Sequence, residues 1–332
     1  MASDSYIAGF SSDSVTRRAF LRGGLVVAGG AVLGAKGAAT FAQTSPVDGP
    51  YRSRVVQARS ADVVTLRGIR QELLNDLVSV ALRRVTGASS ETEAWSRILR
   101  PDDVVALKFD AVGTDQLATM PTMVRAVAGS LAASGFDMSR VVAVDASASV
   151  VAEAGIKPAR WGWSPQAVDF ASGRDRLAVW LDDVTAIVNV PLLATHSITG
   201  LSGSLTNLAY SVVKHPAGAF GHHGSPYVAD IVALPQVGRK LRLTLVDALR
   251  VVIDGEADSE DAVIWDAGML LGSVDALAVD VVGLHVVNAA RARAGLPSIG
   301  KHKDGPAYLD AAGQRGLGAR RMYEIELLKF KL

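Results

Sequence analysis

Four short apolar segments of the chain end in polar residues that could do chemistry. The segments are residues 103–109, 140–145, 186–190 and 242–246, and the polar residues at their ends are Lys108, Asp110, Asp145, Asn189 and Asp247. Lysine and carboxylate groups can carry protons, and carboxylate and amide groups can bind a ligand or an ion. We therefore predict that Lys108 and Asp145 are catalytic and that the other three bind a ligand. The alternative is that these Asp and Asn residues only begin turns and cap helices.

A polar loop and a predicted helix follow the third of these segments, over residues 189–208. His196 lies in the loop, and small hydroxyl-bearing and glycine residues lead into the helix. Backbone N–H groups at a helix start suit an anionic ligand. We expect such a ligand to contact Ser202, Gly203, Ser204 and Asn207, with His196 as a catalytic proton carrier or a metal ligand. The loop lacks the Gly-Lys-Ser/Thr ending of a P-loop, which disfavours nucleotide hydrolysis.

Four of the six histidines fall within residues 196–223, namely His196, His215, His222 and His223. Neutral imidazole is a common metal ligand, and Asp or Glu could complete a divalent site. A divalent metal ion held by His and Asp is therefore one expected cofactor. The alternative is that these histidines are solvated loop residues, because their spacing does not match a helical His-x-x-x-His pair.

The elements that must position these residues alternate along residues 51–332. Valine-rich runs alternate with segments of helical periodicity, which predicts an α/β domain with a mostly parallel central sheet and helices on both faces. Because parallel strands end at one edge of an open sheet, their polar residues should meet there. Residues 274–292 should form a long helix. Asp280 on this helix would need a partner if buried, and we expect a hydrogen bond to the loop at 189–208.

Residues 155–183 interrupt the alternation of strands and helices. They hold three of the five tryptophans, among proline and glycine residues. Two interpretations stay open, a packed surface excursion and a lid that covers a ligand.

The composition excludes several classes of function. The 34 Lys and Arg residues nearly balance 33 Asp and Glu, so the formal net charge is +1 and nucleic acid is not expected as a partner. The chain has no cysteine, which excludes disulfides, thiolate nucleophiles and cysteine-ligated iron–sulfur clusters. The expected ligand is instead a small molecule or an ion.

The first 42 residues are typical of a twin-arginine export signal. Arg17 and Arg18 precede an apolar segment that is shorter than the roughly 20 residues of a membrane-spanning helix. We expect cleavage after Ala42, a linker at 43–50 and a single domain at 51–332. The domain would then be periplasmic or otherwise extracytoplasmic, with the twin-arginine machinery as a partner and no stable membrane span. The alternative is an uncleaved anchor or a chance basic pair.

Most of residues 100–320 resemble the family catalogued as domain of unknown function 362. The matching motifs are Val105-Ala106-Leu107-Lys108, Asn189-Val190-Pro191, Thr195-His196, Thr199-Gly200, Gly203, Asn207-Leu208, residues 273–280, Tyr308-Leu309 and residues 316–318. The resemblance implies a protein of a kind that is often exported and for which no common activity is established. Ala194 and Thr206 stand where the family usually has lysine, so this chain lacks two positive charges there.

Two functions stay open at this point. The first is a metal- or cofactor-dependent enzyme whose site lies at the strand ends. The second is a non-catalytic periplasmic ligand-binding or assembly protein.

Overall fold

A computed structural model describes residues 51–332 of the chain, apart from residues 217–222 and 301–305. The predicted export signal at 1–42, the predicted linker at 43–50 and His222 lie outside the described residues. Among the residues that are described, no helix has the length and apolar character needed to cross a membrane.

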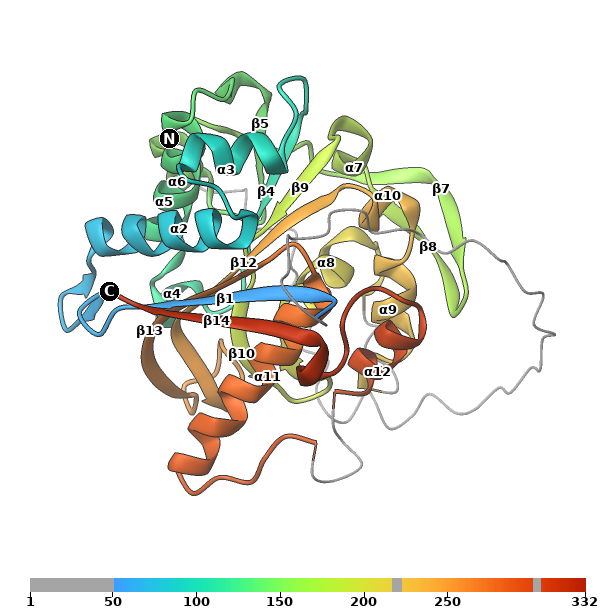
Figure 1. Cartoon of the computed structure of the whole chain (residues 1–332). Helices are drawn as coiled ribbons and strands as arrows, with labels where there is room; N and C mark the ends of the chain where they lie inside the picture. Colours follow the sequence, from blue (N-terminus) through green and yellow to red (C-terminus); the bar gives the residue numbers. More distant parts are fainter. Residues whose placement is uncertain (1–50, 217–222, 301–305) are drawn as a thin grey trace, which may run out of the picture. The chain divides into compact units, whose positions relative to one another are not determined.

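The described part of the chain folds around a ten-stranded, mostly parallel sheet, which confirms the predicted α/β class (Figure 1). Along the sheet the strands are ordered β14 (Ile325–Lys331), β1 (Ser53–Arg59), β13 (Val263–Ser273), β12 (Leu241–Asp254), β9 (Ala186–Asn189), β4 (Val105–Lys108), β5 (Val141–Val144) and β6 (Lys157–Pro158). β13 is antiparallel to both neighbours, and the other neighbouring pairs in this order are parallel. Two further strands, β10 (Leu192–His196) and β11 (Gly200–Ser202), form a hairpin that joins β12 through β10.

Helices cover both faces of the sheet, as predicted. On β4, Val105 and Leu107 pack into one hydrophobic core while Ala106 packs into the other. The first core includes residues of α2 (Gln71–Thr86), α3 (Glu91–Ile98), α5 (Met120–Ala133) and α6 (Ala148–Glu153). The second includes residues of α8 (Ser204–Val212), α9 (Tyr227–Val232), α11 (Ala276–Arg293) and α12 (Ala307–Gln314). A strand that is buried on both faces needs apolar residues at successive positions, which is why β4 is a continuous apolar run.

Local sequence signals fix the ends of two of these helices. α2 ends at Gly87, which adopts a left-handed conformation with a φ of 70° and closes the last turn. α11, the helix predicted at 274–292, begins after Asp275, whose side chain accepts a hydrogen bond from the backbone N–H of Ala278.

Two elements differ from the sequence-based prediction. The strand expected at 242–246 is the first part of the longer strand β12, so Asp247 lies within a strand and not after one. Residues 192–202, expected as a loop, form the β10–β11 hairpin. β12 continues as one arm of a hairpin with the next strand, β13, and β10 continues alongside β12, which is distant in the sequence. Leu117, Leu192 and Val252 belong to a small third core formed between these extensions.

Residues 155–183 contain a separate hairpin of β7 (Trp163–Phe170) and β8 (Gly173–Ala178), followed by α7 (Trp180–Asp183). Trp180 is buried in the core, whereas Trp161 is 62% exposed and meets Trp163 edge to face. The end of this segment is therefore part of the packed domain, and a role as a lid stays a prediction.

Candidate functional site

The register of the parallel strands places four residues in one row across the sheet. Lys108 at the end of β4 lies opposite Val144 of β5 on one side and Asn189 of β9 on the other, and Asn189 lies opposite Thr244 of β12. Side chains at paired positions point to the same face of a sheet. The row therefore brings Lys108, Asn189 and Thr244 together on one face.

Lys108 is the buried cation of this row, with 1% of its side chain exposed. Its Nζ donates hydrogen bonds to the carbonyl oxygen of Phe109 (2.5 Å) and to Oδ1 of Asn207 (2.6 Å), and it lies 3.0 Å from Oδ2 of Asp145. A buried ammonium group is tolerated only when it is paired and hydrogen-bonded. These three partners use all three donors of the ammonium group.

Asp145 reaches Lys108 through an unusual backbone conformation. It follows β5 directly and has a φ of 56°, in the left-handed region that costs a non-glycine residue on the order of 1 kcal/mol. Its side chain is 20% exposed, so this carboxylate faces both Lys108 and solvent. Outliers of this kind cluster at functional sites, which is consistent with the predicted role of Asp145.

A chain of amide and hydroxyl groups continues from Lys108 into α8. Asn207 Nδ2 donates to Asn189 Oδ1 (2.8 Å), and Asn189 Nδ2 donates to Oγ and the carbonyl oxygen of Ser204 (3.0 and 3.1 Å). The Ser204 hydroxyl lies 3.0 Å from that of Thr244. These residues are all buried. In both Asn189 and Asn207 the side-chain oxygen accepts a hydrogen bond and the side-chain nitrogen donates one. The network therefore fixes the position of Lys108 relative to α8.

The first turn of α8 binds a carboxyl group of the chain itself. Asp280 of α11 accepts hydrogen bonds from the backbone N–H groups of Ser204 (2.6 Å) and Leu205 (2.9 Å), which confirms the expected contact of Asp280 with this segment. The N–H of Gly203 is bound by the Thr206 hydroxyl (2.8 Å). We expected a ligand anion at this helix start, and Asp280 occupies that position because a buried carboxyl needs these donors. Ser202 lies half-buried at the end of β11, and its ligand role stays a prediction.

Two further carboxyl groups, Asp110 and Asp247, line a small cavity beside this network. The cavity of about 10 Å³, room for about one water molecule, also touches Thr119 and Leu192. Burial raises the pKa of Asp110, with Lys108 acting in the opposite direction. Burial raises the pKa of Asp247 to about 6, against the lowering effect of hydrogen bonds from Thr119 and Leu249. Asp247 can therefore exchange a proton close to neutral pH.

Comparison with known families places this network within a recognised domain. Residues 105–285 match the family model described as Domain of unknown function (DUF362). The chain belongs to this family. The match runs from β4 into α11, so it contains Lys108, Asp145, the segment at 189–208 and Asp280. No curated protein matches the chain significantly.

Tyr210 is a residue of the DUF362 site that the sequence-based prediction missed. It lies on α8, and burial raises the pKa of its phenol, followed by the nearby carboxylates of Asp110, Asp145 and Asp258. The sequence could have indicated this residue through its position, since Tyr210 follows Asn207 by three residues and residues three apart share a helix face.

The histidines of the DUF362 domain occupy separate places. His196 ends β10, and its Nδ1 accepts hydrogen bonds from the N–H groups of Ile198 (3.2 Å) and Thr199 (3.3 Å), within its own hairpin. His223 Nδ1 lies 2.9 Å from the carbonyl oxygen of Ile198, and His215 Nδ1 lies 2.9 Å from Asp175 Oδ1. In the described part of the chain, no group of three or more His, Asp or Glu side chains is arranged to hold a metal ion. A metal site that includes His222 stays a prediction.

The stability of the DUF362 domain should fall as the pH rises from about 4 to about 7. Burial raises the pKa of Asp280 from 3.8 to about 7, despite the hydrogen bonds from Leu205 and Ser204. In this interval the folded state keeps a proton that the unfolded state has lost. The contribution of Asp280 to the free energy of unfolding is therefore largest below about pH 4 and decreases up to about pH 7. The decrease is at most about 1.4 kcal/mol per pH unit.

Urea unfolding at about pH 4.5 and about pH 7.5 measures this effect. An Asp280→Asn variant cannot titrate at this position and should lose less stability between the two conditions. An equal loss in both proteins would show that Asp280 does not hold the proton.

Proposed function

We propose that this DUF362 protein is exported and binds a small cation at the carboxyl ends of β4, β5 and β9, beside β12. The observation that carries the proposal is an excess of carboxylates over cations at this edge. Asp110, Asp145 and Asp247 stand against Lys108, which is already paired with Asp145. Arg250 also acts on Asp247, but it lies 3.3 Å from Asp266 in an ion pair of its own.

The electrostatics of the site support a cation more than an anion. Asp145 raises the pKa of Asp110 beyond the effect of burial, and Asp110 does the same for Asp247. A bound positive charge would relieve this repulsion between like charges. A small anion would add to it, and the helix start that could have bound an anion is filled by Asp280. A protonated amine needs only part of this set of acceptors. A divalent metal ion is the other cation class to test, and it would have to draw the carboxylates together, because in the described part of the chain they are not arranged to hold a metal ion.

Export is supported by the sequence at the amino terminus. Arg17 and Arg18 precede an apolar segment, followed by small residues at 40 and 42. The site would then meet ligands of the periplasm or another extracytoplasmic compartment.

Thermal unfolding of the full chain with added ligands tests the proposal. The probes are Mg²⁺, Ca²⁺ and putrescine, with phosphate and acetate as anions. We expect one cation class to raise the Tm by a few degrees at a concentration well above its Kd, since ligands that bind only the folded state stabilise it. Reversal by a chelator identifies the metal, and persistence in chelator identifies the amine.

Matched variants locate the binding site. Asp110→Asn should abolish the shift, and Asp169→Asn, which changes an exposed carboxylate on β7, should leave it intact. A Tm increase with phosphate or acetate alone, the absence of a shift with every cation, or an unchanged shift in Asp110→Asn would contradict the proposal.

An acid–base enzyme is the second candidate, and it is favoured by Asp247. The pKa of this carboxyl group is about 6, and it shares its cavity with Asp110 and Thr119. A group that titrates near neutral pH suits a proton carrier. Lys108 and Asp145 would then position the ligand, and an Asp247→Asn variant that keeps cation binding would separate proton transfer from binding.

A further inference from the structure

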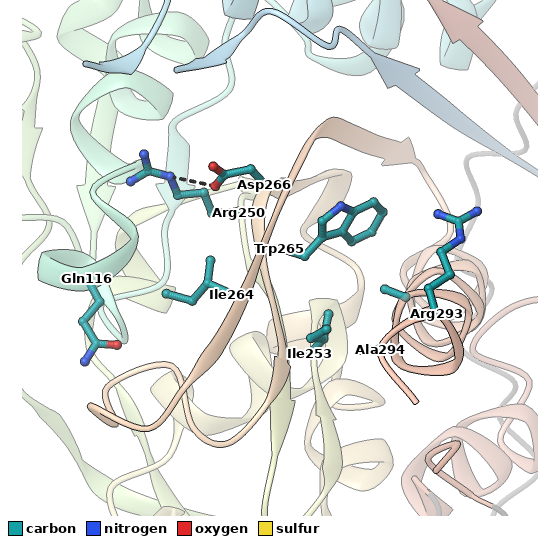
Figure 2. Close-up of a pocket in the computed structure, with 9 residues that line it drawn as sticks. Gln116, Arg250, Ile253, Ile264, Trp265, Asp266, Arg293 and Ala294 are labelled. Carbon is teal, nitrogen blue, oxygen red and sulfur yellow. Dashed lines mark ion pairs between the residues drawn. The ribbon is translucent and has the colours of Figure 1, made fainter. Parts of the chain in front are cut away.

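A second concave site lies away from the hydrogen-bond network around Lys108. It is on the part of the β12–β13 hairpin next to the turn between the two strands. It is a groove of about 640 Å³ bordered by the hairpin, the last turn of α11 and α4 (Thr114–Leu117) (Figure 2). Sites for small organic molecules commonly enclose about 300 to 1,000 Å³. The volume therefore suits one such molecule.

Apolar side chains form much of the lining of this groove. They are Ile253, Ile264, Trp265, Ala290 and Ala294. Trp265 is half-buried and lies on the side of α11, with the guanidinium carbon of Arg59 5.9 Å from its ring centroid. Its neighbour Ile264 is 37% exposed and points to the other face of the hairpin. Figure 2 shows Trp265 between the hairpin and the end of α11. Accessible apolar groups gathered in a concave site favour an apolar ligand body.

The charged lining residues leave one positive charge in excess. Arg250 is held by the carbonyl oxygen of Leu117 (2.9 Å) and by Asp266 (3.3 Å), so Arg250 and Asp266 balance each other. Arg293 lies in the last turn of α11, and among the described residues no ion pair engages it. An arginine at the edge of an apolar groove suits a carboxylate, sulfonate or phosphate group.

We propose that the α11 side of this groove binds an amphipathic organic anion, with an aromatic or branched apolar body against Trp265 and one acidic group for Arg293. The proposal is independent of the strand-end site, because the two sites select ligands of opposite charge. The groove is nevertheless close to that site along the chain, since Arg250 holds the carbonyl oxygen of Leu117, two residues before Thr119.

Binding of the fluorescent probe anilinonaphthalene sulfonate to the full chain tests this proposal. The probe carries an aromatic body, a sulfonate and an N–H group. Its uncharged analogue phenylnaphthylamine lacks only the sulfonate. We expect saturable binding of the sulfonate, and binding about fivefold weaker or more for the uncharged analogue, which corresponds to the loss of one accessible charge interaction.

Four variants distinguish this groove from other apolar surface. Arg293→Gln changes an exposed residue and should weaken sulfonate binding about fivefold without altering the Tm. Trp265→Ala should weaken it by about tenfold or more, as loss of an aromatic anchor does. The matched controls are Arg174→Gln on β8 and Trp161→Ala, which is 62% exposed, and both should bind as the parent protein does.

Two results would overturn the proposal. One is equal binding of the sulfonate by the parent, Arg293→Gln and Trp265→Ala proteins. The other is loss of binding in Trp161→Ala or Arg174→Gln. Because Arg293→Gln does not affect the core, a result on this variant stands even if Trp265→Ala fails to fold.

Discussion

Replacing Gly203 with alanine should destabilise the folded domain by about 3 kcal/mol or more. A Cβ atom at this position would lie 2.4 Å from Oδ1 of Asp280, closer than any such contact allows. The backbone of Gly203 is extended, with a φ of −165°, so the effect comes from this approach and not from backbone strain. Moving Asp280 away would leave the N–H groups of Ser204 and Leu205 without their acceptor in the buried first turn of α8.

A double-mutant cycle in urea isolates this contact. In an Asp280→Ala background the clash is absent, so Gly203→Ala should cost less than about 1 kcal/mol there. Gly129→Ala is the matched control, because a Cβ atom at this position on α5 meets no atom within 4 Å and alanine should stabilise the helix by up to about 1 kcal/mol. An equal effect of Gly203→Ala in both backgrounds would show that Asp280 is not the cause.

The central strands of the fold could be predicted because their signal is local. β4, β5 and β9 are short apolar runs bounded by polar residues, and burial on both faces requires that pattern. The far half of β12 and the β10–β11 hairpin were missed for two different reasons. β12 pairs with the next strand, β13, but the pattern of residue types does not indicate where such a hairpin ends. β10 pairs with β12, which lies far along the chain and gives no local signal.

The candidate site was predictable to a similar extent. The rule that parallel strands end at one edge was enough to bring Lys108, Asp145 and Asn189 together. The contact of Asp280 with residues 189–208 was expected separately, from the need of a buried carboxyl for a partner, but not that this carboxyl takes the place at the start of α8 where a ligand anion was expected. The excess of carboxylates over cations at the site could not be predicted either, because the sequence does not show which carboxyl groups share a cavity.

Replacing Lys108 with methionine should change stability and cation binding in opposite directions. Methionine is apolar and of similar length, but it leaves Asn207 Oδ1 and the Phe109 carbonyl oxygen without their donor in a buried site. Because Asp145 is 20% exposed, it can regain part of its hydration, and we expect a loss of about 2 to 4 kcal/mol in the free energy of unfolding. Lys157→Met on β6, at an exposed position, should stay within about 0.5 kcal/mol of the parent protein.

Cation binding should become severalfold tighter in Lys108→Met, because removing the ammonium group frees Asp145 to interact with the ligand. A protein that is merely damaged would bind more weakly, so the direction of the change separates the two explanations. Adding Asp145→Asn to Lys108→Met should reverse the gain, since the freed carboxylate is then gone. Isothermal titration of the folded variants with the cation that stabilises the parent protein gives the three affinities. Weaker binding in the folded Lys108→Met protein would contradict the idea that the ammonium group competes with the cation, and would mean that Lys108 is needed to hold Asp145 and Asn207 in place for binding.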